Sequence, residues 1–139
     1  MNKKNILWVD DDVNRMTLLP DRDALEAKEF NIIAINRVDI FLQFIKEADH
    51  QISCIILDMN MPTGCLNQNE TQYGTRTGIP LYKAIRENPN YNNTIIVVYS
   101  VFNKEDMGSF GEKEDVVFLS KDLKSGEFAE RIYELVNNK

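Results

Sequence analysis

Ile6-Leu7-Trp8-Val9-Asp10-Asp11-Asp12 places three aspartates directly after four consecutive apolar residues. An apolar run without alternation is typical of a strand that is buried on both faces of a sheet. Further runs of this kind follow along the chain at 32–35, 54–57, 95–99 and 116–119. The sequence therefore predicts five short buried strands.

The segments between these runs have a helical spacing of apolar residues. This spacing predicts helices over 38–49, from 79 to the stop at Asn88-Pro89-Asn90, and from the residue after Ser125-Gly126 to 136. The segment 14–30 contains Pro20, so it forms either a kinked helix or a helix with Pro20 at its first position that runs to Glu29. The segment 103–110 has the weakest helical pattern, because glycines interrupt it early.

Strands that alternate with helices predict right-handed crossovers and a parallel sheet covered on both sides. The expected fold class is α/β, a doubly wound five-stranded parallel sheet of (βα)5 order in one domain, 1–139, with no second domain. Segment 63–77 is polar, contains Gly64 and Gly74, and is predicted to be an extended loop inserted after the third strand. It is either a lid or docking element near the site, or a neutral insertion.

The composition excludes several classes of protein. The 139 residues are 43% hydrophobic and 27% charged, with a net charge of −6, which is typical of a globular domain. An acidic surface repels phosphate backbones, so we expect no direct nucleic-acid partner. The apolar runs are too short to cross a bilayer, the N-terminus has no signal-peptide pattern, and Cys54 and Cys65 are expected to be reduced thiols. We therefore expect a cytoplasmic protein without membrane insertion.

Polar residues that could carry chemistry fall at the ends of the predicted strands, where parallel sheets place their ligand sites. They are Asp10-Asp11-Asp12, Asp58, Ser100 and Ser120-Lys121. Carboxylates about 4 Å apart repel by on the order of 4 kcal/mol, so the site must take up a proton or a cation. Oxygen ligands without His or Cys favour Mg²⁺. A carboxylate nucleophile, a divalent cation, a lysine and a hydroxyl are the groups that phosphoryl transfer to an aspartate requires.

Val9-Asp10-Asp11, Leu57-Asp58-Met59-Asn60-Met61-Pro62, Tyr99-Ser100 and Lys121 follow one another at these strand ends. Together they resemble the signature of the receiver domain of bacterial response regulators. The resemblance covers essentially the whole chain and implies a flavodoxin-like fold.

The resemblance implies that Asp58 is the phosphoacceptor, which takes a phosphoryl group from a histidine kinase or a histidine-phosphotransfer protein. It further implies that Asp11, Asp58 and the backbone carbonyl of Asn60 hold Mg²⁺, with Asp10 supporting the water shell of the metal.

The resemblance also assigns roles on the later strands. Lys121 would pair with phosphoryl oxygens, Ser100 would bond the phosphorylated side chain, and Phe118 would be an aromatic switch behind it. A downstream protein would read the altered surface, and the transfer would not make the chain an enzyme with a turnover substrate. Because the last helix closes near the end of the chain, we expect a stand-alone or excised receiver with no output domain.

Four features depart from the pattern of that family. Asp122 follows Lys121 where the family usually has proline, often after a cis peptide; a cis bond without proline is costly, so the sequence leaves open whether this peptide is cis, or trans with Lys121 placed differently. Val101 is bulkier than the usual residue after the hydroxyl and is expected to narrow access to Asp58. Phe102 is expected to shield an acyl phosphate from water, and segment 63–77 is longer than the loop of the family.

Simpler interpretations exist for several of these residues. Asp12 is expected to be only a helix N-terminal carboxylate, and Ser100 alone would be a turn residue. Phe118 is equally consistent with a core residue of a central strand. His50 is expected to face solvent at a helix end, whereas Trp8 and Cys54 are expected to be core residues.

Two other functions fit parts of the sequence. Asp10-Asp11-Asp12-Val13 resembles the D-x-D-x-V motif of haloacid-dehalogenase-type phosphatases, with Asp10 as nucleophile and Asp12 as acid/base. That family needs a further acidic pair after the lysine, and its motif leaves Asp58 unexplained. The third candidate is a receiver-like interaction module that accepts no phosphate, which Asp122, Val101 and the long loop favour.

Overall fold

The computed structural model describes residues 3–13, 18–47, 51–71, 74, 76–101 and 103–138. Within these residues, one parallel sheet has the strand order β2-β1-β3-β4-β5. Its strands are β1 (Asn5–Val9), β2 (Asn31–Ile35), β3 (Ile52–Leu57), β4 (Ile95–Ser100) and β5 (Val116–Ser120). The predicted doubly wound α/β fold is confirmed.

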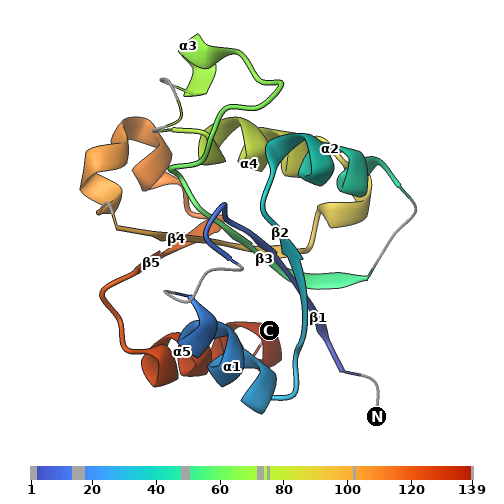
Figure 1. Ribbon diagram of the computed structural model, residues 1–139, viewed down its shortest axis with the longest axis vertical. Coiled ribbons are helices and arrows are strands. Elements are labelled where there is room, and N and C mark those ends of the chain that lie inside the picture. The colour runs from blue at the N-terminus through green and yellow to red at the C-terminus, as the bar shows by residue number, and fades with distance from the viewer. Residues whose placement is uncertain are drawn as a thin grey trace.

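Helices cover both faces of the sheet (Figure 1). The elements on one face are α1 (Leu19–Ala27) and α5 (Ser125–Asn137); those on the other are α2 (Val38–Lys46), α4 (Gly78–Arg86) and the 3-10 helix η2 (Lys104–Glu112). The short helices α3 (Gln68–Thr71) and η1 (Pro89–Tyr91) lie in connections. Segment 63–77 is therefore a long connection, as expected, but it contains the short helix α3, which extends away from the sheet in Figure 1.

Helix boundaries differ from the predicted ones where the backbone leaves the helical region. Pro20 lies in the first turn of α1, which confirms the shorter of the two alternatives, but this helix ends at Ala27 because the chain turns at Glu29, with a φ of 67°. Helix α2 ends at Lys46, since Glu47 is extended. Helix α5 begins at Ser125 and so includes the glycine that was expected to precede it.

The expected weakness of segment 103–110 is confirmed, because the backbone of Gly108, with a φ of 60° and a ψ of −138°, is not helical and divides η2 into two short 3-10 segments. His50 and residues 14–17 lie outside the described residues.

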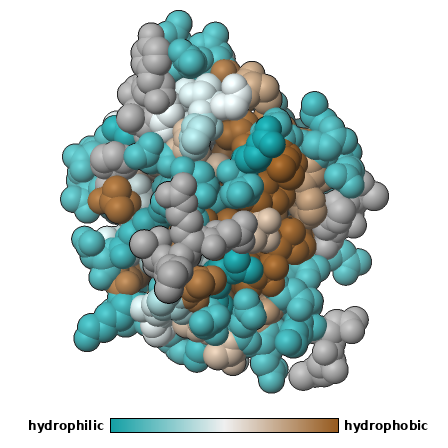
Figure 2. Space-filling view, in the orientation of Figure 1, coloured by the Kyte–Doolittle hydropathy of each residue, from teal (hydrophilic) through white to brown (hydrophobic). Residues whose placement is uncertain are grey.

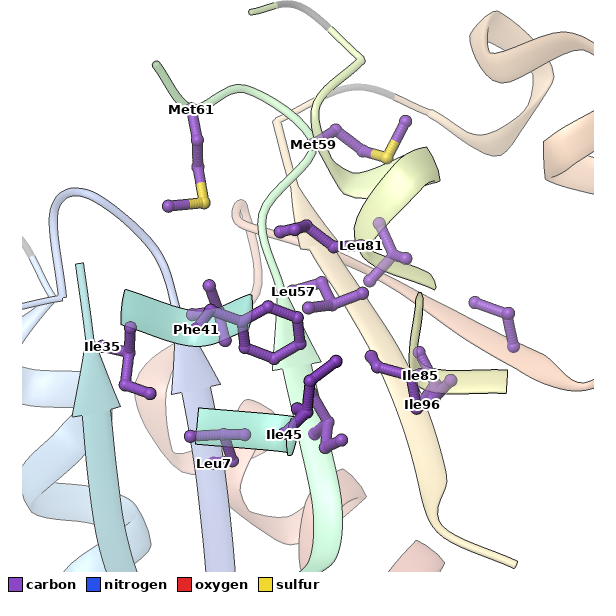
Figure 3. Packing of buried hydrophobic residues seen from close by; sticks show 14 of the residues in the cluster. Leu7, Ile35, Phe41, Ile45, Leu57, Met59, Met61, Leu81, Ile85 and Ile96 are labelled. Carbon is purple, nitrogen blue, oxygen red and sulfur yellow. The ribbon is translucent and has the colours of Figure 1, made fainter. Parts of the chain in front are cut away.

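Alternate strand residues contribute to two cores, one on each face of the sheet. Trp8 and Cys54 are fully buried in the core under α1 and α5, as predicted. The other core contains Leu7, Leu57 and Phe41, which Figure 3 shows packed between the sheet, α2 and α4. The face turned to the viewer in Figure 2 is largely hydrophilic, with one hydrophobic band in the region where Figure 1 draws α2 and β2. Among the described residues, no helix combines the length and apolar character needed to cross a membrane.

Candidate functional site

The acidic residues and the lysine that the sequence analysis selected meet at one edge of the sheet. Asp10 follows β1, Asp58 follows β3 and Lys121 follows β5. The Nζ atom of Lys121 lies 2.8 Å from Oδ2 of Asp10 and 3.5 Å from Oδ2 of Asp58. Both carboxylates are buried. The predicted juxtaposition of Asp58 and Lys121 is therefore observed.

Backbone hydrogen bonds between the strand ends hold these residues in register. The amide of Asp58 donates to the carbonyl of Val9 at 3.0 Å, and the amide of Asp10 donates to the carbonyl of Ile35 at 3.1 Å. The amide of Lys121 donates to the carbonyl of Ser100 at 2.9 Å. The ends of the strands, rather than flexible loops, thus set the spacing of the charged side chains.

Burial and mutual repulsion perturb the carboxylates. Burial, followed by the charge of Asp10, raises the pKa of Asp58 to about 7, although Lys121 acts in the opposite direction. Burial and the charges of Asp12 and Asp10 raise the pKa of Asp11. Burial acts to lower the pKa of Lys121, but the charges of Asp58 and Asp10 outweigh it and raise this pKa. The site therefore carries more negative charge than its lysine balances.

A hollow of about 430 Å³ opens beside these groups. Its lining residues are Asp11, Asp12, Asp58, Asn60, Met61, Pro62, Gly74, Val101 and Lys121. Hence Asp58 and the expected metal ligands Asp11 and Asn60 face a common space, with Asp10 behind them. A larger cavity of about 970 Å³ lies between η2 and β5 and does not include Asp58.

The residues present fit a hard cation. Asp10, Asp11 and Asp12 each place a carboxylate oxygen within 4.8 Å of the others. Oxygen donors with surplus negative charge are the environment that Mg²⁺ prefers. Asp12 belongs to the acidic cluster, whereas α1 as described begins at Leu19; residues 14–17 between them lie outside the described residues, so the interpretation of Asp12 as a helix N-terminal carboxylate stays a prediction.

Ser100 and Phe118 are not among the residues that line the hollow, and both lie on the sheet face that carries η2. Val98 pairs with Phe118 and Ser100 pairs with Ser120, so the side chains of Ser100 and Phe118 share that face. Ser100 is buried, and the ring of Phe118 packs edge-on against Phe110 at 5.7 Å. The assignment of Phe118 to a central strand is wrong, since β5 is an edge strand and Phe118 is half-buried.

The departures from the family pattern leave the charged cluster intact. No cis peptide bond occurs among the described residues, so the Lys121–Asp122 peptide is trans, and Lys121 nevertheless reaches Asp10 and Asp58. Val101 is 63% exposed and lines the hollow. Phe102 lies outside the described residues.

Sequence reasoning missed two residues of segment 63–77 that bear on the site. Gly74 lines the hollow, and its carbonyl accepts a hydrogen bond from the amide of Met61 at 3.0 Å. Thr77 is fully buried, and its Oγ1 donates to the carbonyl of Met61 at 2.7 Å. Gly74 was noted only as a loop residue, and its φ of 96° is the feature that glycine supplies there.

No family model matches this chain, and no curated protein matches it. Solved structures do. The chain is similar to a response regulator receiver protein from Sinorhizobium medicae, with a TM-score of 0.73 and 20% identity over 98% of this chain and 96% of that one. Chemotaxis protein CheY4 from Vibrio cholerae gives a TM-score of 0.68 and 20% identity over 97% and 99% of the two chains.

The chain is also similar to a response regulator protein from Burkholderia pseudomallei that was crystallised with a phosphorylated aspartic acid, a calcium ion and citrate. The TM-score is 0.67, and the identity is 16% over 97% of this chain and 67% of that one. At these identities the similarity shows the fold, which is the flavodoxin-like receiver fold of response regulators.

Proposed function

We propose that this chain is a phosphoacceptor receiver of a two-component or phosphorelay system, in which Asp58 accepts a phosphoryl group. The observation that carries the proposal is the position of Lys121, whose ammonium group lies between Asp10 and Asp58. Asp58 reaches the hollow, so a donor can approach it, whereas Lys121 stands ready to pair with an incoming anion. The receiver fold supports this assignment.

We propose that Asp11, Asp58 and the backbone carbonyl of Asn60 hold Mg²⁺, with Asp10 and Asp12 supporting its water shell. When bound, the ion neutralises negative charge on the phosphoryl oxygens. The surplus of carboxylates over lysine in the cluster supports this assignment. The similar Burkholderia protein contains a calcium ion and a phosphorylated aspartate, which is consistent with it.

The transfer itself needs little covalent chemistry from the protein. An oxygen of the Asp58 carboxylate forms a bond to phosphorus while the phosphorus–nitrogen bond of a phosphohistidine breaks. The imidazole nitrogen keeps the electron pair of that bond and takes up a proton. Lys121 then pairs with a phosphoryl oxygen, so the positive charge stays beside the new acyl phosphate.

The donor is a histidine kinase or a histidine-phosphotransfer protein, and the output is the binding of a downstream protein. Ser100 moves to bond the phosphorylated side chain, and Phe118 turns behind it. Both side chains share one sheet face with η2, which supports a change of surface on that face. The chain acts as a cytoplasmic switch rather than as an enzyme that turns over a substrate.

The phosphatase alternative has less support. Asp10 is fully buried, its Oδ2 contacts Lys121, and its Oδ1 accepts a hydrogen bond from the amide of Asp12. A nucleophile must reach its substrate, and Asp58, not Asp10, lines the hollow.

The test is intact mass after incubation with acetyl phosphate and Mg²⁺ for the wild type, Asp58→Asn, Asp10→Asn and Asp23→Asn. Asp23 is an exposed aspartate of α1 and serves as the matched control. We expect the wild type and Asp23→Asn to gain one phosphoryl group, Asp10→Asn to gain it weakly, and Asp58→Asn to gain none. A gain that requires Asp10 and ignores Asp58 would establish the phosphatase-like mechanism instead. No gain in any folded variant would favour the interaction module.

A further inference from the structure

Segment 63–77 is fastened to the residues that follow Asp58. The amide of Met61 donates to the carbonyl of Gly74 at 3.0 Å, and the carbonyl of Met61 accepts from Oγ1 of Thr77 at 2.7 Å. Both backbone polar groups of Met61 are thus bonded to the end of segment 63–77, in a buried environment. Buried bonds of this kind are costly to lose, because water does not replace them.

The first residue of α4, Gly78, follows Thr77 directly and adds a further attachment. The amide of Gly78 donates to the carbonyl of Met59 at 3.4 Å. A Cβ atom on Gly78 would lie 3.0 Å from the carbonyl oxygen of Asp58, so this approach to the phosphoacceptor backbone leaves no room for a side chain. Two consecutive residues, Thr77 and Gly78, therefore hold the backbone of residues 58–61 in place.

Side-chain burial fixes the same residues from the other direction. Met59 and Met61 are buried, and Figure 3 shows them leaving the loop in different directions, Met59 beside α4 and Met61 toward the part of the core that contains Phe41. Asn60 lies between these two anchored residues and is itself exposed at the hollow. The orientation of the Asn60 carbonyl is consequently set by what holds its two neighbours.

Thr77 holds its hydroxyl in an unusual way for its place in the chain. It occupies the N-cap position of α4, yet its side chain makes no capping hydrogen bond, and its backbone is helical. Instead, Oγ1 donates to the carbonyl of Met61 and lies 3.3 Å from the carbonyl of Gly74. A hydroxyl has one proton to donate, and here that proton is directed at the carbonyl of Met61, in the loop that follows Asp58, rather than at the start of the helix.

We propose that Thr77 is a positioning residue that, through Met61, orients the backbone carbonyl of Asn60 for binding Mg²⁺. Segment 63–77 is then part of the metal site and not a neutral insertion. This inference rests on the proposed function, because that function assigns the Asn60 carbonyl to the metal.

The test compares Thr77→Val with Thr94→Val. Thr94 is also a buried threonine whose Oγ1 donates to a backbone carbonyl, that of Ile52 at 3.3 Å, but at the opposite end of the sheet. Each variant loses one buried hydroxyl at nearly constant shape, so both are expected to lower the melting temperature of the metal-free protein by a similar amount. The affinity for Mg²⁺ is measured by isothermal titration calorimetry.

We expect Thr77→Val to weaken Mg²⁺ binding about tenfold, as the loss of groups that orient metal ligands does elsewhere. Thr94→Val should bind Mg²⁺ as the wild type does, and Thr77→Ser, which keeps the hydroxyl, should restore the affinity. In Gly74→Ala the new Cβ would lie 2.9 Å from the carbonyl oxygen of Met61, so this variant should also displace Met61 and weaken Mg²⁺ binding. It replaces Thr77→Val in the test if that variant does not fold.

Wild-type affinity in Thr77→Val with a lowered melting temperature would overturn the inference and leave the proposed function standing. A wild type that binds no Mg²⁺ and gains no phosphoryl group on Asp58 would overturn both.

Discussion

The two faces of the sheet are built differently. Under α1 and α5, Trp8, Tyr99 and Phe128 are almost fully buried and in contact, with the rings of Tyr99 and Phe128 stacked at 4.1 Å. On the other face, Phe118 is only half-buried, and a cavity of about 970 Å³ separates parts of η2 from β5. One face is a tightly packed aromatic core, and the other is open around its 3-10 helix.

This difference indicates on which face of the sheet side chains have space to change position. Ser100 and Phe118, the proposed switch residues, share the open face with η2. Close-packed interiors resist displacement, whereas a side chain beside a cavity changes position at lower cost. A change at Asp58 is thus expected to spread toward η2 and leave the α1 and α5 face unaltered.

The largest expected effect on stability comes from replacing one phenylalanine on each face of the sheet by alanine. Phe128→Ala removes a fully buried ring and should cost about 3–5 kcal/mol of the free energy of unfolding. Phe118→Ala should cost clearly less, because the ring is half-buried at an edge strand. Urea unfolding of both variants measures the difference. Equal losses would show that the face with η2 is packed as tightly as the other.

The contrast also marks how far the sequence could predict the structure. The unbroken apolar runs predicted the strands because burial on both faces removes the alternation of ordinary strands. Asp58 and Lys121 were predicted to meet because the topology alone brings the carboxyl ends of parallel strands together. The contact of Thr77 with Met61 was not predicted, since it joins a loop side chain to a backbone carbonyl 16 residues away. Hydrophobic periodicity contains no information about such a bond.

The next largest effect is a dependence of stability on pH, which comes from the Asp58 carboxylate at the edge of the sheet. The pKa of Asp58 in the folded protein is raised to about 7 by burial and by Asp10, so between about pH 4 and 7 the folded state holds this proton more tightly than the unfolded state. Metal-free stability should therefore fall as pH rises through this window, by at most about 4 kcal/mol. Asp58→Asn should remove this loss and be more stable than the wild type at pH 8.

Urea unfolding at pH 5 and pH 8, without Mg²⁺, tests this prediction. The exposed control Asp23→Asn should keep the wild-type dependence on pH. An unchanged slope in Asp58→Asn would mean that another group dominates.

Two tyrosine–aspartate hydrogen bonds compare the faces at a smaller scale. The hydroxyl of Tyr99 donates to buried Asp21 at 2.9 Å, and burial and this carboxylate raise the pKa of Tyr99. The hydroxyl of Tyr82 donates to Asp115 at 2.6 Å at an exposed position. Tyr99→Phe leaves a buried carboxyl group without this donor and should cost about 1–3 kcal/mol, whereas Tyr82→Phe should cost less than about 1 kcal/mol.

Thermal unfolding of the two variants gives the comparison directly. A larger loss of stability in Tyr82→Phe than in Tyr99→Phe would mean that Asp21 finds another partner or water once the hydroxyl is lost. The face under α1 and α5 would then be less rigid than its aromatic packing indicates.

Glycine to alanine substitutions provide the smallest and sharpest contrast. Gly108 in η2 has a φ of 60° and a ψ of −138°, a conformation that side chains disfavour. Gly126 lies in α5, and a Cβ atom at either glycine would meet no neighbour within 4 Å. Gly108→Ala should therefore destabilise by about 1 kcal/mol through backbone strain alone, and Gly126→Ala should stabilise by about 0.5–1 kcal/mol. Opposite signs in denaturant unfolding would locate the strain in η2. Two stabilising substitutions would mean that η2 readily adopts another backbone conformation, which is the mobility that the open face needs if it is to respond to Asp58.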